Sequence, residues 1–202
     1  LVGASNYEDG RTNGGCLRIL DFQRGASGES VLGQLSSAGP LAMADVEGHG
    51  ALWLFVGGRV VPGRYPEPAD SLLLRNEGGR FVLAQKFERL GLVSGAVFSD
   101  LDGDGTPELL LACEWGPIRV LHYDGRAFID ITERLGLARY LGWWTSVTTG
   151  DFDGDGQMDI VAGNWGLNHR QRRLDQVHPL RLYYGDSLCR GMLDLNEALF
   201  VP

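Results

Sequence analysis

Two short segments place carboxylates at alternate positions of a tight turn, an arrangement suited to binding a hard cation. The first, DLDGDGTPE, begins at Asp100, and the second, DFDGDGQMD, begins at Asp151. In both segments aspartates stand at positions 1, 3 and 5, and position 9 is acidic. Glycine at position 6 lets the backbone bend sharply, and a carbonyl oxygen at position 7 can add a ligand. The two segments therefore predict two loops that bind calcium, an ion that takes six to eight oxygens.

The predicted ligands are all oxygen donors. They are the side chains of Asp100, Asp102, Asp104, Glu108, Asp151, Asp153, Asp155 and Asp159, with the backbone oxygens of Thr106 and Gln157. Zinc would instead favour histidine or cysteine. An EF-hand needs a glutamate at position 12 and two flanking helices, but position 12 is Leu111 or Ala162. A merely polar turn would explain one such loop, whereas two copies in one frame favour an ion.

The acidic loops belong to a repeat of about 50 residues. Asp151 follows Asp100 by 51 residues, and a related segment, DVEGHGALW, begins at Asp45. Each loop is followed by a short apolar run, and such runs divided by Gly, Asp and Asn are typical of strands. Internal repetition at this period indicates a propeller or a solenoid, and four strands for each repeat indicate propeller blades.

The predicted fold is therefore all-β, as a β-propeller fragment of about four four-stranded blades. We expect one domain, with approximate blades at 1–39 (partial), 40–91, 92–141 and 142–202. Both ends of the chain read as strand interiors, which predicts an open arc cut at both ends. For such a fragment the missing signal peptide is uninformative.

The loop segments also resemble a known family. DLDGDGTPELLLA and DFDGDGQMDIVAGNWG are similar to the FG-GAP or VCBS repeats of integrin-like β-propellers. The stretch GWWTSVTTGDFDGDGQMDIVAGNWGLN, followed by HPLRLYYGD, resembles propellers found with ASPIC-type domains. The resemblance covers nearly the whole chain and is strongest over 92–168. It implies calcium between the first and second strands of a blade, with the ten ligands named above.

Two further loops depart from the family pattern. In the loop that begins at Asp45, Glu47 and His49 replace the second and third aspartates, and Trp53 replaces the acid at position 9. In the segment 185–198, Leu188 and Arg190 take the inner ligand positions. We therefore expect about two Ca²⁺ ions, and none at these two loops.

Composition excludes several classes of protein. The 202 residues carry a net charge of −8, whereas a nucleic-acid-binding protein would show a basic excess. No run of 18 apolar residues exists, so we expect no membrane span. The three cysteines, Cys16, Cys113 and Cys189, include no CxxC pair, so neither a zinc site nor a disulfide framework is indicated.

The leading functional prediction is a calcium-stabilised propeller that serves as a protein interaction or adhesion scaffold, with an unknown protein or glycan as its partner. No catalytic constellation can be assembled around the four histidines, so we expect no enzyme. Two alternatives remain open: a carbohydrate-binding propeller, supported by Trp143, Trp144 and Trp165, and a propeller enzyme. Weak calcium loops fill only near millimolar calcium, which predicts an extracellular, periplasmic or cell-surface location.

Overall fold

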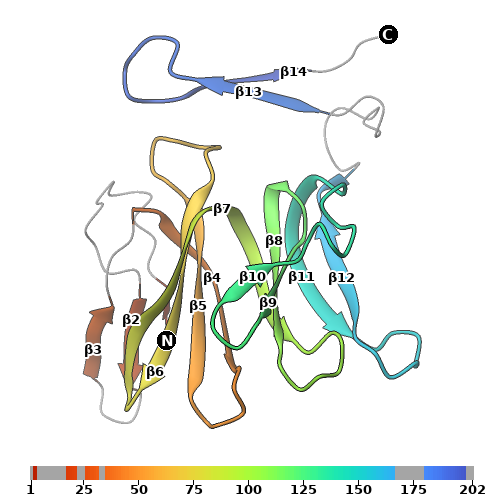
Figure 1. The fold of residues 1–202 in the computed structure, drawn as a ribbon. Coiled ribbons are helices and arrows are strands. Elements are labelled where there is room, and N and C mark those ends of the chain that lie inside the picture. The colour runs from red at the N-terminus through yellow and green to blue at the C-terminus, as the bar shows by residue number, and fades with distance from the viewer. Residues whose placement is uncertain (1, 4–16, 22–25, 32–34, 167–179, 199–202) are drawn as a thin grey trace.

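A computed structural model describes residues 2–3, 17–21, 26–31, 35–166 and 180–198 of the chain (Figure 1). The described residues form antiparallel sheets and contain no α-helix, which confirms the all-β prediction. The N-terminal sheet consists of β1 (Val2–Gly3), β2 (Leu17–Asp21) and β3 (Ala26–Val31).

Two antiparallel meanders share one long strand. The first contains β4 (Ser37–Asp45), β5 (Leu52–Val60), β6 (Ala69–Glu77) and the first half of β7 (Arg80–Ser99). The second contains the rest of β7, β8 (Glu108–Gly116), β9 (Arg119–Tyr123) and β10 (Phe128–Asp130). The exchange of partners coincides with Arg89 at φ 50° and Gly91 at φ 150°. This left-handed backbone, which suits glycine, bends β7 from one sheet into the next.

Two hairpins follow the second meander. β11 (Gly142–Gly150) pairs with β12 (Asp159–Asn164), and its first residues also pair with the end of β8. β13 (Arg181–Gly185) pairs with β14 (Asp194–Ala198). Each hairpin encloses a loop that begins with an aspartate, as do the pairs β4–β5 and β7–β8.

Residues about one repeat apart lie side by side in β7 and β11. The Ser94 hydroxyl donates a hydrogen bond to the Trp144 carbonyl at 2.6 Å, and the Thr149 hydroxyl donates to Ser99 Oγ at 2.9 Å. A Cβ added to Gly95 would lie 3.1 Å from Ser146 Cα, because the two backbones approach closely. The repeat seen in the sequence is therefore also a repeat in space.

Buried side chains form separate cores between successive sheets. Along β5, Trp53 and Phe55 enter one core while Leu54 enters another, because neighbouring side chains of a strand face opposite ways. The first of these cores lies between the two meanders, and the second includes Leu17 of the N-terminal sheet. Leu110 of β8 faces a third core that reaches β11 and β12. The N-terminal sheet, the two meanders and the β11–β12 hairpin are therefore stacked, with apolar side chains between neighbours.

Candidate metal centres

Each predicted calcium loop joins two antiparallel strands. The first loop runs from Asp100, directly after β7, to Glu108, the first residue of β8. The second runs from Asp151, after β11, to Asp159, the first residue of β12. The glycines at position 6 have φ near 88° and 87°, in the region that side chains disfavour. The chain therefore turns back inside each loop, and position 9 is held by a strand.

The backbone of each loop wraps around its first aspartate. The N–H groups of Gly103 and Gly105 donate to the two Asp100 carboxylate oxygens at 2.8 and 2.9 Å. In the second loop, Gly154 and Gly156 donate to Asp151 at 2.7 and 3.0 Å. These donors offset part of the repulsion among the carboxylates, and they hold the first aspartate in one orientation.

The loop carboxylates converge in groups of three. One oxygen from each of Asp100, Asp102 and Asp104 lies within 4.8 Å of the other two, and Asp151, Asp153 and Asp159 form a second such group. Oxygen donors at this spacing fit a hard cation such as calcium. These clusters could hold metal ions.

The other four predicted ligands lie outside these two groups. Asp155 accepts a hydrogen bond from the Gln157 N–H at 2.8 Å, as Asp104 does from the Thr106 N–H at 2.7 Å. The ligand roles of Asp155 and of the Thr106 and Gln157 carbonyls stay predictions. Glu108, the remaining predicted ligand, belongs to a third group with Asp102 and His122.

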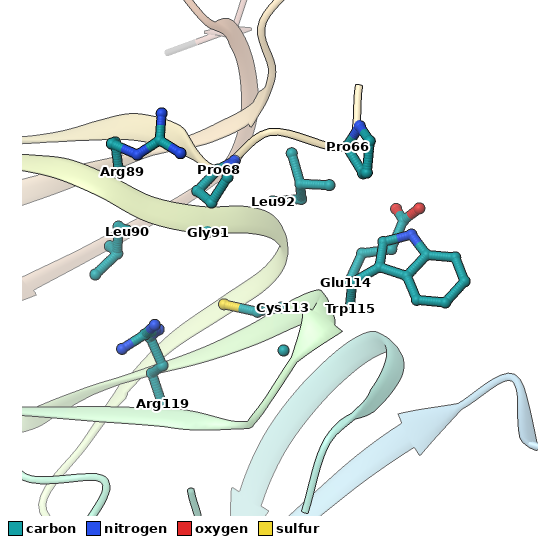
Figure 2. A pocket seen from close by; sticks show the side chains of 11 residues that line it. Pro66, Pro68, Arg89, Leu90, Gly91, Leu92, Cys113, Glu114, Trp115 and Arg119 are labelled. Atoms are coloured by element: carbon teal, nitrogen blue, oxygen red, sulfur yellow. The ribbon is translucent and has the colours of Figure 1, made fainter. Parts of the chain in front are cut away.

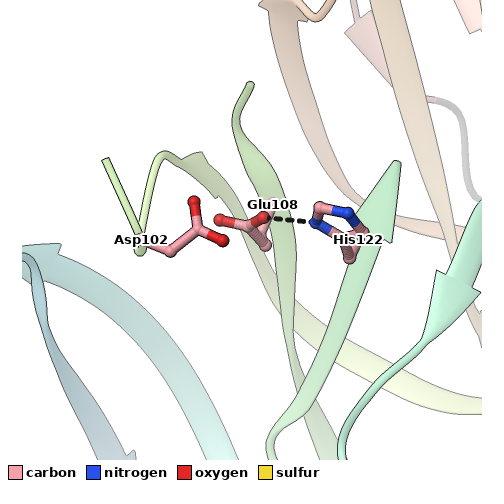
Figure 3. Close-up of side chains that lie close together, drawn as sticks. All are labelled: Asp102, Glu108 and His122. Atoms are coloured by element: carbon pink, nitrogen blue, oxygen red, sulfur yellow. Dashed lines mark hydrogen bonds and ion pairs between the residues drawn. The ribbon is translucent and has the colours of Figure 1, made fainter. Parts of the chain in front are cut away.

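The acid at position 9 differs between the two loops. The Glu108 side chain is 3% exposed; one oxygen accepts the Leu101 N–H at 2.9 Å, and the other lies 2.8 Å from His122 Nδ1 (Figure 3). Asp159 is not buried and accepts the Phe152 N–H at 3.0 Å. The sequence pattern does not connect His122 with the loop, since only strand register brings it to Glu108.

In the loop that begins at Asp45, backbone N–H groups again bond to the first aspartate, but positions 5 and 9 are not acidic. Asp45 accepts N–H groups from His49 and Gly50, at 3.2 and 2.6 Å. The carboxylate at position 3, Glu47, forms a salt bridge of 2.7 Å with Arg75, whose guanidinium also lies 5.5 Å from the ring centroid of Trp53. A protein cation therefore stands beside the one acid that this loop retains near its centre.

The loop at Asp186 shows the same wrap. Its carboxylate accepts N–H groups from Arg190 and Gly191, both at 2.8 Å, and the Ser187 hydroxyl donates to Asp194 at position 9. All four loops thus share one backbone frame, although only two of them carry the full set of acids.

Comparison with known families identifies the segment that holds both acidic loops. Residues 100–162 carry an FG-GAP-like repeat. This confirms, for that interval, the resemblance seen in the sequence. The interval begins at the first loop's leading aspartate and ends within β12, so it includes both loops in full.

A solved structure is also similar to this chain. It is the crystal structure of the exotype rhamnogalacturonan lyase YesX, with 16% sequence identity and a TM-score of 0.46. The similarity covers 96% of this chain and 41% of that chain, so this chain spans about two fifths of the lyase's length. A likeness at this score decides nothing about activity. No curated protein matches the chain.

A buried polar network lies at the end of strand β8 that is opposite the acidic loop at 100–108. Glu114, 4% exposed, accepts hydrogen bonds from Arg59 and from the Tyr65 hydroxyl. Trp115 donates from Nε1 to the Tyr65 oxygen at 2.6 Å. Burial, together with the bond to Glu114, raises the pKa of Tyr65, so this hydroxyl stays a donor. The network joins the β5–β6 connection to the end of β8.

A crevice of about 120 Å³ lies beside this network (Figure 2). Its walls include Pro66, Leu92, Trp115 and the thiol-bearing Cys113. Burial raises the pKa of the Cys113 thiol to about 11, which leaves it protonated and unreactive at neutral pH. The chemistry of this crevice is therefore that of packing rather than nucleophilic attack.

Of the three tryptophans proposed for sugar stacking, Trp143 and Trp165 pack on each other. Trp143 lies between Trp115 and Trp165, with ring centroids 4.9 and 4.5 Å away, and Trp144 donates to the Tyr140 carbonyl at 3.1 Å. Trp165 is 42% exposed.

Among the described residues no helix is both long and apolar enough to span a bilayer.

Proposed function

We propose that this chain is an arc of a calcium-stabilised β-propeller that acts as an interaction scaffold outside the cytoplasm. The observation that carries the proposal is the pair of loops within 100–162, each with three converging carboxylates in one frame. A propeller scaffold needs rigid blades and loops of fixed shape. An ion bound in each acidic loop would fix the shape of that loop.

The stacked sheets support the blade assignment. The first meander and the second meander each have four antiparallel strands, and β7 is the last strand of one and the first strand of the next. Cores between successive sheets are what radially arranged blades require. On this proposal β11 and β12 begin a third blade, and the N-terminal sheet belongs to the blade before β4.

Calcium is the proposed ion because of the donor set and its flexibility. Magnesium demands near-ideal octahedral geometry and keeps several waters, whereas calcium accepts six to eight oxygens in irregular arrangements. Loops that bind at dissociation constants of about 10⁻⁴–10⁻³ M are filled only where calcium is near millimolar. An extracellular, periplasmic or cell-surface location follows from the ion, and fractionation of the protein in its native cells tests it. A cytosolic location would contradict this part of the proposal.

Calcium titration by calorimetry, paired with melting in calcium and in chelator, tests the proposal. We expect two ions in the unsubstituted chain, with Asp102→Ala and Asp153→Ala each removing one. With a dissociation constant near ~0.1 mM and free calcium near ~1 mM, each ion adds about 1.4 kcal/mol to the free energy of unfolding. For a chain of this length, that raises the melting temperature by about 3–6 °C for each site.

Glu47→Ala is the matched control, because it changes a loop acid whose partner is already Arg75. It should change neither the number of ions nor the stabilisation by calcium. Absence of binding heat, with equal melting temperatures in calcium and chelator, would refute the calcium proposal. Three or four bound ions would show that the loops at Asp45 or Asp186 bind as well.

The partner is proposed to be a protein or a glycan. We place the scaffold role first because Trp143 packs against both Trp115 and Trp165. Of the five tryptophans, only Trp165 is classed as exposed. Binding to a glycan array that is lost in Trp165→Ala would favour the carbohydrate-binding alternative. Without such binding, the scaffold role stands.

A further inference from the structure

We propose that His122 positions Glu108 and thereby makes the loop at 100–108 a tighter calcium site than the loop at 151–159. This inference rests on the proposed function, since it assumes that both loops bind calcium. It concerns a residue that lies outside the nine-residue loop pattern and contributes no oxygen.

The register of the β8–β9 hairpin places the histidine. Leu109 lies opposite Leu121 in this antiparallel pair, so the preceding residue, Glu108, faces His122 across the ladder. The ring nitrogen Nδ1 lies 2.8 Å from one Glu108 oxygen, on the opposite side of the carboxylate from Asp102 (Figure 3). The His122 side chain is 23% exposed and the Glu108 side chain is 3% exposed, so little water competes for this contact.

Both Glu108 oxygens are therefore restrained before any ion arrives. One is held by His122 and the other by the Leu101 N–H at 2.9 Å. Each carboxylate oxygen has two lone pairs, which leaves one on each for a cation. When Nδ1 carries the proton, it donates to Glu108 and fixes the direction of the carboxylate. Such outer partners orient ligands, and their loss typically weakens metal affinity by about 10- to 100-fold.

The other loops have no equivalent of this histidine among the described residues. Asp159 is shorter and not buried, and within the part of the chain that the structure describes β12 pairs with β11 alone. In the first meander the same cross-strand position is taken by Arg75, opposite Trp53. That arginine bonds to Glu47, so an arginine stands where the second meander has an imidazole beside the loop acid. The third strand of each meander thus carries a different residue at this position: Arg75 beside the loop that has lost acids, and His122 beside the loop that keeps them.

The experiment isolates each loop in the full chain and measures calcium affinity by calorimetry. Asp153→Ala leaves only the loop at 100–108, and Asp102→Ala leaves only the loop at 151–159. In the first background, His122→Leu should weaken calcium binding about 10-fold or more. His122→Asn should restore most of the affinity, because its amide N–H stands at the same number of bonds from the backbone as Nδ1. In the second background, His122→Leu should leave the affinity unchanged.

Melting of each variant in chelator shows that it is folded before its affinity is compared. Unchanged affinity in the His122→Leu chain of the first background would overturn the proposal. An equal loss in both backgrounds would also overturn it, since that would show a general structural role. Failure of His122→Asn to restore binding, with zinc binding more tightly than calcium, would make His122 a direct ligand instead. No calcium heat in the unsubstituted chain would overturn the proposed function together with this inference.

Discussion

Replacement of Arg59 by methionine tests whether the buried Glu114 is held by an ion pair. The Glu114 side chain is 2% exposed, and its charge is balanced by the guanidinium of Arg59 and by a hydrogen bond from Tyr65. Methionine keeps most of the length of the side chain but removes the positive charge. The substituted protein would bury a carboxylate with one neutral partner.

The expected cost follows from burial on the two sides of the pair. Removal of one partner from a fully buried pair costs about 3–5 kcal/mol. Arg59 is 38% exposed, so water already shares its side of the interaction and screens it. We therefore expect Arg59→Met to lower the free energy of unfolding by about 2–3 kcal/mol. For a chain of this length, that corresponds to a fall of roughly 4–12 °C in melting temperature.

A double-mutant cycle separates the charge effect from lost packing. Glu114→Gln keeps an oxygen that accepts from Tyr65 and removes the charge, so its expected cost is about 1–2 kcal/mol. Once the charge is absent, adding Arg59→Met should cost about 1 kcal/mol or less, which gives a coupling energy of roughly 1–2 kcal/mol.

The assay is thermal and urea unfolding at pH 7 in chelator, which removes any contribution from calcium. A cost below about 0.5 kcal/mol for Arg59→Met, with no measurable coupling to Glu114→Gln, would refute this account of the network. It would show that Tyr65 alone suffices to hold the carboxylate.

Three further predictions concern the core, the approach of β7 to β11, and the cysteines. Phe55→Ala should cost about 3–5 kcal/mol in denaturant unfolding, because the ring is fully buried; a loss under about 1 kcal/mol would contradict the described core. Gly95→Val should destabilise by about 1–3 kcal/mol, since its Cβ would meet the β11 backbone at 3.1 Å, and an unchanged melting curve would show that the strands separate easily. In a Cys16→Ser background, one thiol should react rapidly with a disulfide reagent at pH 8. That thiol is the exposed Cys189, whereas Cys113, whose pKa burial raises to about 11, should react only after unfolding; two fast thiols would contradict its burial.

The acidic loops show how much a local pattern determines. Asp100, Asp102 and Asp104 are separated by single residues, and Gly105 permits the turn, so their convergence follows from nine residues of chain. The same reasoning extends to the strands after the loops, whose apolar runs are typical of strands. The runs in β5 and β8 are buried, whereas β12 is partly exposed. These features depend on neighbours in the chain, and the sequence alone was enough to predict them.

Contacts between distant residues had to be decided by the tertiary structure. His122 reaches Glu108 because the turn after β8 sets the register of the hairpin, and a slip of one residue would turn it to the other face. Arg59 and Tyr65 meet Glu114 from 55 and 49 residues away, where β7 bends from one sheet to the next. Spacing along the chain does not predict such contacts, because they depend on strand register and on how separate sheets stack. The sequence by itself therefore determined which loops hold the acids. The register of β8 and β9 decided that Glu108 receives a partner from the neighbouring strand, and the stacking of the sheets decided the partners of Glu114.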